Sequence, residues 1–357
     1  MGTSSIPALT APGIKTKQKA RESKKGRTRI TPPSITRLPI AGRARRLVLM
    51  EPAGNREMKR VVSLLPSATE IVAALDCADW LVGRSHECDF PPDVQALPVC
   101  TAPRLDLSGS SAEIDAKVKA AVANAASVYE VLQGPLADCA PDVILTQDQC
   151  EVCAVSLADV EAAICDWAGR PARIVSLKPM TLADVFEDVA RVGAALGITE
   201  QGRSVADDLR DRARDLTVTP TGPRPRVACI EWTDPLMAAG NWVPELVAMA
   251  GGEDVFGTPG EHAPWITWED LKSADPDVIV FMPCGFGLER AAAEARLLMA
   301  AHPQFKNLKA IRTGRVYATD ANSYFNRPGP RLVESLGLLV AAFGGQDLPP
   351  GIERMID

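Results

Sequence analysis

The sequence predicts an α/β protein of two lobes, each built on a mostly parallel sheet, bridged by one long α-helix. From Met58 onward, short apolar runs alternate with helical patterns, which is typical of βαβ units around a parallel sheet. Residues 181–216 have helical periodicity and contain no strand candidate. A similar Pro-Asp-strand phrase lies on each side of that stretch, at Ala140–Leu145 and at Asp275–Val280. These three observations together indicate two similar lobes and a helix between them.

Apolar runs bounded by turn residues predict the elements of the first lobe. In chain order we expect a strand at Arg60–Leu65, a helix at Thr69–Leu75, a strand at Ala140–Thr146, a helix at Ser156–Trp167 and a strand at Arg173–Leu177. The bridging helix follows, with apolar residues at helical spacing and Gly197 as its one weak point.

The second lobe begins after a Thr-, Pro- and Gly-rich linker at Thr217–Pro225. Strands are expected at Arg226–Ile230, Val278–Met282 and Arg315–Thr319, and helices at Pro244–Ala250, Thr267–Ala274, Leu288–Ala300 and Pro330–Phe343. The predicted domains are residues 58–180, the bridging helix 181–217, residues 218–346 and a tail at 347–357.

Composition limits the class of protein. The chain has 357 residues, of which 46% are hydrophobic and 24% charged, as in ordinary globular proteins. No apolar stretch is long enough to span a membrane. The net charge of −6 argues against a nucleic-acid partner. We expect a monomer.

The basic head at residues 1–57 differs from the rest of the chain. It holds 13 Lys and Arg against 3 Asp and Glu, has no periodicity, and is predicted to be disordered. A transit peptide, a solvated tail and untranslated sequence before Met58 remain open as explanations. No secretory signal is visible, so we expect a cytoplasmic protein. A periplasmic or membrane-associated location is the alternative if the start is misassigned.

An ordered set of phrases carries a family resemblance. They are Val61–Glu70, Leu81–Pro92, Pro141–Leu145, Gly251–Phe256, Trp265–Leu271, Arg315–Tyr317 and Asn326–Arg331. The chain resembles the periplasmic cobalamin-binding proteins of ABC importers, within the wider group that binds iron chelates and vitamin B12. The resemblance implies the class III substrate-binding-protein fold, with two Rossmann-like lobes, and a binding protein rather than an enzyme. It also implies that Glu113 and Glu269 dock onto membrane subunits of the importer, although carboxylates are common in the first turn of a helix.

A corrinoid ligand needs flat apolar surfaces and scattered hydrogen-bonding groups. Ligands of open α/β sheets bind beyond the carboxyl ends of the strands, and the loops expected there supply such side chains. The predicted ligand-binding residues are His86, Glu87, Cys88, Cys150, Cys153, Trp232, Met237, Asn241, Trp242, Cys284, Tyr324, Phe325, Asn326 and Arg327. We expect the protein to capture cobalamin, a related corrinoid or another metal chelate in a cleft between the lobes, as a ligand rather than a catalytic cofactor.

Cysteine usage raises a second possibility for the same loops. Nine cysteines, an odd number, favour reduced thiols, and Cys77, Cys139, Cys165 and Cys229 lie in apolar runs that predict burial. Cys150 and Cys153 instead form a Cys-x-x-Cys pair at a helix start. We hypothesise that these two, with His86, Cys88 and Cys284, bind a soft metal or approach the cobalt of a corrin. The alternative function is a cytoplasmic metal-binding or thiol-redox protein on the same fold.

Overall fold

The computed structural model describes residues 57–123, 128–148, 157–164 and 171–356. All of the described residues belong to one unit of the chain, which begins at Glu57. No helix within these ranges is long and apolar enough to cross a membrane.

The first lobe contains a four-stranded parallel sheet in the order β2-β1-β5-β6. Its strands are β1 (Val61–Ser63), β2 (Leu81–Arg84), β5 (Val143–Gln147) and β6 (Arg173–Leu177). Its helices are α1 (Pro66–Ala74), α2 (Ser111–Ala123), α3 (Gln133–Asp138) and α4 (Leu157–Ile164), with short 3₁₀ turns at Ala78–Trp80 and Pro92–Ala96. A separate antiparallel pair, β3 (Thr101–Pro103) and β4 (Tyr129–Val131), flanks the segment that carries α2.

The second lobe contains a six-stranded sheet in the order β12-β11-β10-β7-β8, with β9 paired to β7. Its strands are β7 (Arg226–Thr233), β8 (Leu236–Ala238), β9 (Glu253–Asp254), β10 (Val278–Phe281), β11 (Val316–Thr319) and β12 (Ile352–Arg354). Its helices are α7 (Val243–Met249), α8 (Trp268–Ala274), α9 (Leu288–Ala301), α10 (Lys309–Arg312) and α11 (Leu332–Gly344), with a 3₁₀ turn at Pro303–Asn307. β10 runs parallel to β7 and β11, whereas β8 and β12 are antiparallel edge strands. The predicted fold class is therefore confirmed.

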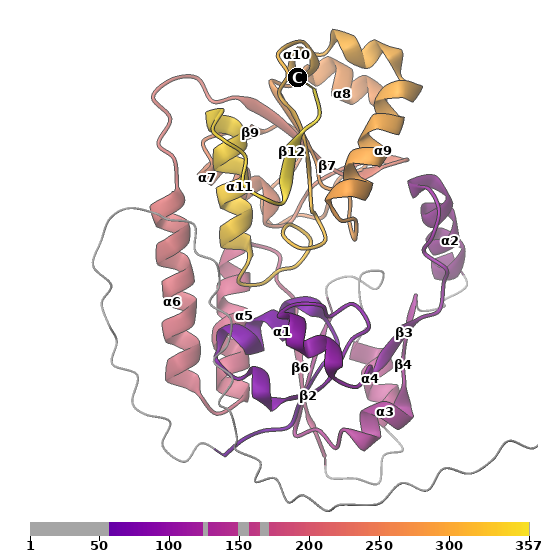
Figure 1. Ribbon diagram of the computed structural model, residues 1–357, viewed down its shortest axis with the longest axis vertical. Helices are drawn as coiled ribbons and strands as arrows, with labels where there is room; N and C mark the ends of the chain where they lie inside the picture. The colour runs from indigo at the N-terminus through magenta and orange to yellow at the C-terminus, as the bar shows by residue number, and fades with distance from the viewer. Residues whose placement is uncertain (1–56, 124–127, 149–156, 165–170, 357) are drawn as a thin grey trace, which may run out of the picture. The chain divides into compact units, whose positions relative to one another are not determined.

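The connection between the lobes differs from the prediction of one continuous helix. It consists of α5 (Leu182–Ala195) and α6 (Thr199–Leu216), which lie side by side (Figure 1). Gly197, with φ of +80°, makes the turn between them in a backbone conformation that glycine adopts at little cost. The apolar spacing continues through this turn because each helix buries its own face. The sequence prediction of a single helix over 181–217 is corrected accordingly.

A glycine pair lets α5 and α6 pack closely. A methyl group added to Gly193 would lie 2.6 Å from the Cα of Gly202, so no larger side chain fits there without a shift. α6 then contacts α11 of the second lobe, where Arg212 and Glu334 pair at 2.8 Å. The helical pair thus joins the two sheets through side-chain packing as well as through the chain.

One apolar cluster extends through both lobes. It includes Val61 of β1, Val189 of α5, Leu209 of α6, Val227 of β7 and Leu336 of α11, all almost fully buried. Cys77, Cys139 and Cys229 are buried as predicted, while Cys165 lies outside the described residues.

Candidate functional site

The loop after β2 carries the densest group of predicted site residues. His86 is half-buried, and its Nδ1 lies 2.7 Å from the hydroxyl of Thr101 at the start of β3. The same hydroxyl oxygen accepts the main-chain N–H of His86 at 3.1 Å and donates to the Ser85 hydroxyl at 3.0 Å. Thr101 and Ser85 are buried, so this polar group holds the imidazole in one position.

Tyr129 of β4 lies against the other side of this group. Its ring centre is 5.3 Å from that of His86, and its hydroxyl donates to Glu87 Oε1 at 3.2 Å. Burial raises the pKa of Glu87, against the lowering effects of Tyr129 and Arg327. Burial, together with the charge of Arg84, lowers the pKa of His86 and so favours the neutral imidazole.

Sequence reasoning missed both Thr101 and Tyr129. Each lies on a three-residue strand with too few residues to show alternation. The available signal for Tyr129 was the short run Val128–Val131, in which three of the four residues favour strands.

Cys88 has a different environment from its neighbours. It is 1% exposed within the apolar cluster, and its sulfur accepts the Thr69 hydroxyl at 3.0 Å. Burial raises the pKa of this thiol to about 11. Protein covers this sulfur and leaves it almost no surface for a ligand, so the prediction of Cys88 as a ligand-binding residue is corrected: it is a core residue.

The predicted metal group gains no support from the part of the chain that the structure describes. Cys150 and Cys153 lie outside the described residues. Cys284, after β10, is half-buried, and its main-chain N–H donates to Glu231 O at 3.0 Å. Among the described residues, no three His, Cys, Asp or Glu side chains lie close enough together to hold a metal ion.

Arg327 takes part in a buried ion-pair network between the lobes rather than presenting a free guanidinium. It contacts Asp89 through both terminal nitrogens, at 2.5 and 3.1 Å, and Glu70 of α1 at 3.2 Å. Arg331 binds both oxygens of Glu70, at 2.8 and 2.5 Å. Burial alone would raise the pKa of Asp89, but the hydrogen bonds and charge of Arg327 hold it below its usual value. The network fixes the loop after β2 against the second lobe.

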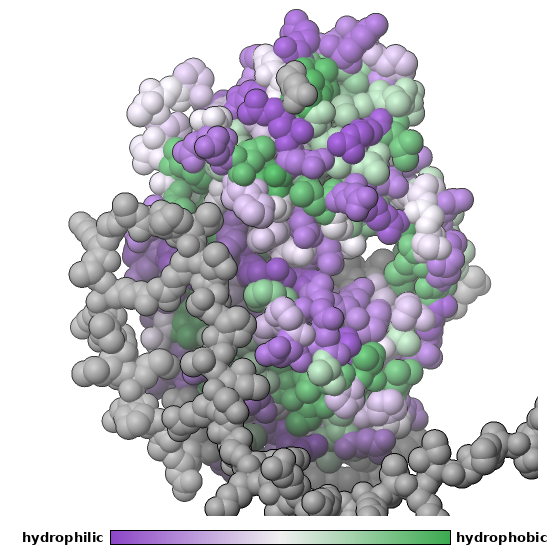
Figure 2. Space-filling model, in the orientation of Figure 1, coloured by the Kyte–Doolittle hydropathy of each residue, from purple (hydrophilic) through white to green (hydrophobic). Residues whose placement is uncertain are grey.

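Water reaches one edge of this interlobe network. The side chains of Glu70 and Arg327 are 2% and 5% exposed, whereas that of Asp89 is 46% exposed. Hydrophilic side chains gather over the α1 region on the face that Figure 2 shows.

Two predicted aromatic contacts belong to the core. Phe325 is fully buried, and Trp242 is 7% exposed with its indole N–H donating to Phe325 O at 2.9 Å. Both predictions are corrected, because these rings are covered by protein. Asn241, with φ of +54°, reaches back to the first lobe, where its amide lies 3.6 Å from the sulfur of Met180.

The remaining predicted residues of the second lobe are half-buried. Trp232 packs against Phe286 with ring centres 5.4 Å apart, and its indole N–H donates to Asp234 O. Met237 lies opposite it on β8. Tyr324 lies beneath the guanidinium of Arg331, and Asn326 has a buried side-chain oxygen with no hydrogen-bond partner among the described residues.

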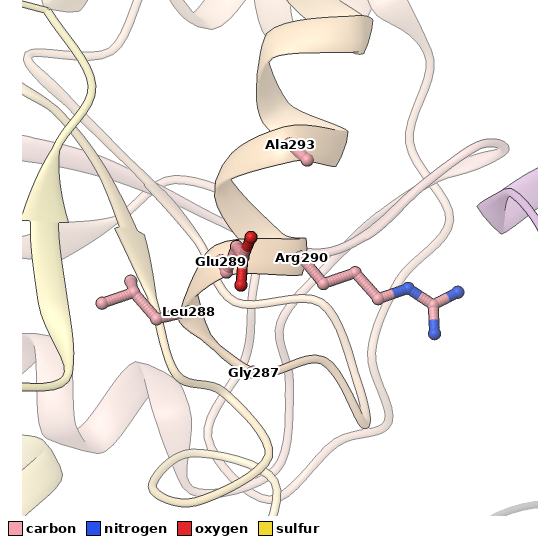
Figure 3. A pocket seen from close by; sticks show the side chains of 5 residues that line it. All are labelled: Gly287, Leu288, Glu289, Arg290 and Ala293. Atoms are coloured by element: carbon pink, nitrogen blue, oxygen red, sulfur yellow. The ribbon is translucent and has the colours of Figure 1, made fainter.

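α2 extends from the first lobe onto the second. The Ser111 hydroxyl lies 2.6 Å from both the Thr233 hydroxyl and a Glu294 carboxylate oxygen. Arg290 of α9 donates to Gly109 O at 2.7 Å, and Figure 3 shows its side chain extending from that helix. A shallow depression of about 500 Å³ surrounds the start of α9 and is lined by Gly287, Leu288, Glu289, Arg290 and Ala293. None of the predicted ligand-binding residues lines it.

Both predicted docking carboxylates are exposed. Glu113 lies in the first turn of α2, where hydrogen bonds from the backbone and hydroxyl of Ser110 lower its pKa. Glu269 lies in the first turn of α8.

Comparison with known proteins identifies the family. A profile described as "Periplasmic binding protein" matches residues 61–323, about three quarters of the chain. The chain belongs to this family. The predicted resemblance is therefore confirmed, and the prediction of a cytoplasmic protein is wrong, because this is a family of periplasmic binding proteins.

Curated relatives include the vitamin B12-binding protein of Vibrio cholerae, 24% identical over 293 residues, with 78% of this chain and 86% of the relative covered. That of Vibrio parahaemolyticus is 23% identical over 298 residues, covering 79% and 88%. These relatives are named as binding proteins rather than as enzymes.

Solved structures support the fold of this periplasmic binding protein. The periplasmic vitamin B12 binding protein of Vibrio cholerae has a TM-score of 0.56 at 21% identity, covering 80% of this chain and 96% of that one. A periplasmic heme-binding protein from Pseudomonas aeruginosa has a TM-score of 0.61 at 19% identity, covering 83% and 97%. The family match does not favour the thiol-redox alternative.

Proposed function

We propose that this periplasmic binding protein captures a corrinoid between its lobes and delivers it to an ABC importer. The observation that carries the proposal is the grouping of Tyr129 of β4 with His86 and Glu87, which lie on a loop that ion pairs hold against the second lobe. The curated vitamin B12-binding relatives, matched over more than four fifths of their length, support the same ligand.

The chemistry of these side chains suits a corrinoid. A corrin ring has a flat apolar face, amide side chains at its rim and a central cobalt. Tyr129 and Trp232 provide aromatic surface, Glu87 and Asn326 provide hydrogen-bonding oxygens, and His86 provides a ring nitrogen. This combination is typical of pockets in which apolar contact gives affinity and a few polar groups set orientation.

Titration of the full chain with cobalamin tests this proposal. We expect saturable binding by calorimetry, and at a hundredfold excess over Kd a stabilisation of about 2.7 kcal/mol, visible as a higher Tm. Trp232→Ala should weaken binding, because it removes half-buried aromatic surface. Leu297→Ala, at a side chain 64% exposed on α9, is the control and should bind as the wild type does.

Hemin is the competing ligand in the same titration, since several solved relatives are heme-binding proteins. The corrinoid proposal would be contradicted if hemin bound while cobalamin gave no binding heat, did not raise the Tm and did not compete with hemin.

We also propose that Glu113 and Glu269 dock the loaded protein onto the importer, since each is an exposed carboxylate in the first turn of its helix, α2 or α8. Replacing both by arginine should leave the corrinoid Kd unchanged and reduce uptake into cells about tenfold or more, because two ion pairs become repulsive. Glu289→Arg reverses a matched exposed carboxylate in the first turn of α9 and should not reduce uptake. Equal uptake by the double variant and the wild type would rule out these docking residues.

A further inference from the structure

The hydrogen bonds around Thr101 determine which nitrogen of His86 carries the proton. A threonine hydroxyl has one proton and two acceptor positions. The Thr101 proton is donated to Ser85, and one acceptor position is taken by the main-chain N–H of His86. Nδ1, at 2.7 Å, therefore donates its own proton to the second acceptor position.

This arrangement leaves the other ring nitrogen with a free lone pair. In a neutral imidazole with the proton on Nδ1, Nε2 is unprotonated. No group of the described residues hydrogen-bonds Nε2. Histidines that bind metals through one nitrogen almost always donate the other N–H to a fixed oxygen, and Thr101, 1% exposed, is such an oxygen.

The imidazole ring of His86 is also held in place, and it lies on the loop that meets the second lobe. Tyr129 packs against it at 5.3 Å between ring centres. Three residues further along the same loop, Asp89 is paired to Arg327 of the second lobe. The imidazole therefore belongs to the segment of the first lobe that meets the second.

We propose that Nε2 of His86 is an axial ligand to the metal of the bound chelate, with Thr101 as the residue that fixes the metal-binding tautomer. The inference rests on the proposed corrinoid function and adds a direct bond from the protein to cobalt. Cys88 takes no part, since its thiol is buried in the core.

Electron paramagnetic resonance of the full chain with cob(II)inamide tests this bond. Cobinamide has no nucleotide base, so any axial nitrogen must come from the protein. One axial ¹⁴N splits each cobalt line into three, and protein labelled with [¹⁵N]histidine should give two lines instead. His86→Ala should abolish the splitting. His262→Ala, which removes an exposed histidine, should retain it.

Thr101→Val separates the positioning role from ligation. The valine keeps the shape of the side chain and removes the oxygen, so splitting should persist while cobinamide affinity falls about tenfold. Thermal unfolding of each variant reports whether it is folded.

The outcomes distinguish the two proposals. Cobinamide bound without nitrogen splitting, or with splitting retained in His86→Ala, overturns the axial ligand and leaves the corrinoid function standing. Failure of both cobinamide and cobalamin to bind the wild-type chain overturns the corrinoid function, and the ligand assignment with it.

Discussion

Replacing Arg327 with methionine should lower the free energy of unfolding by about 2–3 kcal/mol, because the buried carboxylate of Glu70 keeps only Arg331 as its partner and the half-exposed Asp89 loses its arginine. The Arg327 side chain is 5% exposed, and it contacts both Glu70 and Asp89. Methionine fills similar volume, so the loss reports on charge more than on packing. Urea denaturation of the full-length wild type and Arg327→Met at pH 7 measures the difference in free energy of unfolding. The dependence of that free energy on urea concentration should be the same for both proteins.

An exposed arginine provides the matched control. Arg203 is 65% exposed and pairs with Glu200 at 3.0 Å on α6. Arg203→Met should change stability by less than about 1 kcal/mol, because exposed ion pairs contribute little. If Arg327→Met costs no more than this control, the interlobe network does not stabilise the fold.

The pH dependence of the Arg327 effect follows from Asp89. Its pKa is held below the ordinary value of 3.8, so its ionised form is favoured in the folded protein. A lowered carboxyl pKa contributes stability above the unfolded value, and that contribution is lost as pH falls through the folded value. The difference between wild type and Arg327→Met should therefore shrink below about pH 4.

This network was beyond the reach of sequence reasoning. Glu70 and Arg327 are separated by 257 positions in the chain, and no local pattern relates an acidic residue in one lobe to an arginine in the other. The sequence therefore suggested a ligand-binding arginine, which the structure assigns to an ion pair.

Local patterns were sufficient for the strands β1, β5, β6, β7, β10 and β11, but they did not predict β2 or the edge strands β8 and β12. The prediction of Val278–Met282 differs from β10 by one residue, since a β-branched run after a Pro-Asp turn is a strong strand signal. The single bridging helix was wrong for a physical reason. Gly197 interrupts the helix, while the contact that turns α5 against α6, between Gly193 and Gly202, depends on three-dimensional packing.

In the candidate site too, the sequence did not show which individual side chains are buried. His86 and Cys88 lie two positions apart, yet one is half-buried and the other is in the core. A loop has no fixed period, so its sequence does not indicate which side chains point inward. Trp242 and Phe325 were misassigned because an aromatic ring suits a ligand surface and a core equally well.

Asp188→Asn should stabilise the protein at pH 8 by about 1–3 kcal/mol, because it removes a buried carboxylate charge. The Asp188 side chain on α5 is 2% exposed, and burial raises its pKa to about 7 against the charge of Arg191 at 2.7 Å. The other carboxylate oxygen has no hydrogen-bond partner among the described residues. The asparagine amide stays imperfectly paired there, which keeps the gain below the full cost of ionisation.

The sign of the pH dependence distinguishes this group from Asp89. Between pH 3.8 and about 7 the folded state retains a proton on Asp188 that the unfolded chain releases. Stability contributed by this group therefore falls as pH rises through that window and stays low above it. The advantage of Asp188→Asn should be absent near pH 4 and complete at pH 8, as followed by urea denaturation at each pH.

An exposed aspartate on the adjacent helix α6 is the control that separates the effect of burial from that of removing a charge. Asp207 is 71% exposed and pairs with Arg210 at 2.7 Å, so Asp207→Asn should change stability by less than about 0.5 kcal/mol at either pH. Destabilisation by Asp188→Asn at pH 8 would mean that the ion pair with Arg191 outweighs burial. The pKa of Asp188 would then lie below its ordinary value rather than above it, and α5 would depend on that charge for its packing.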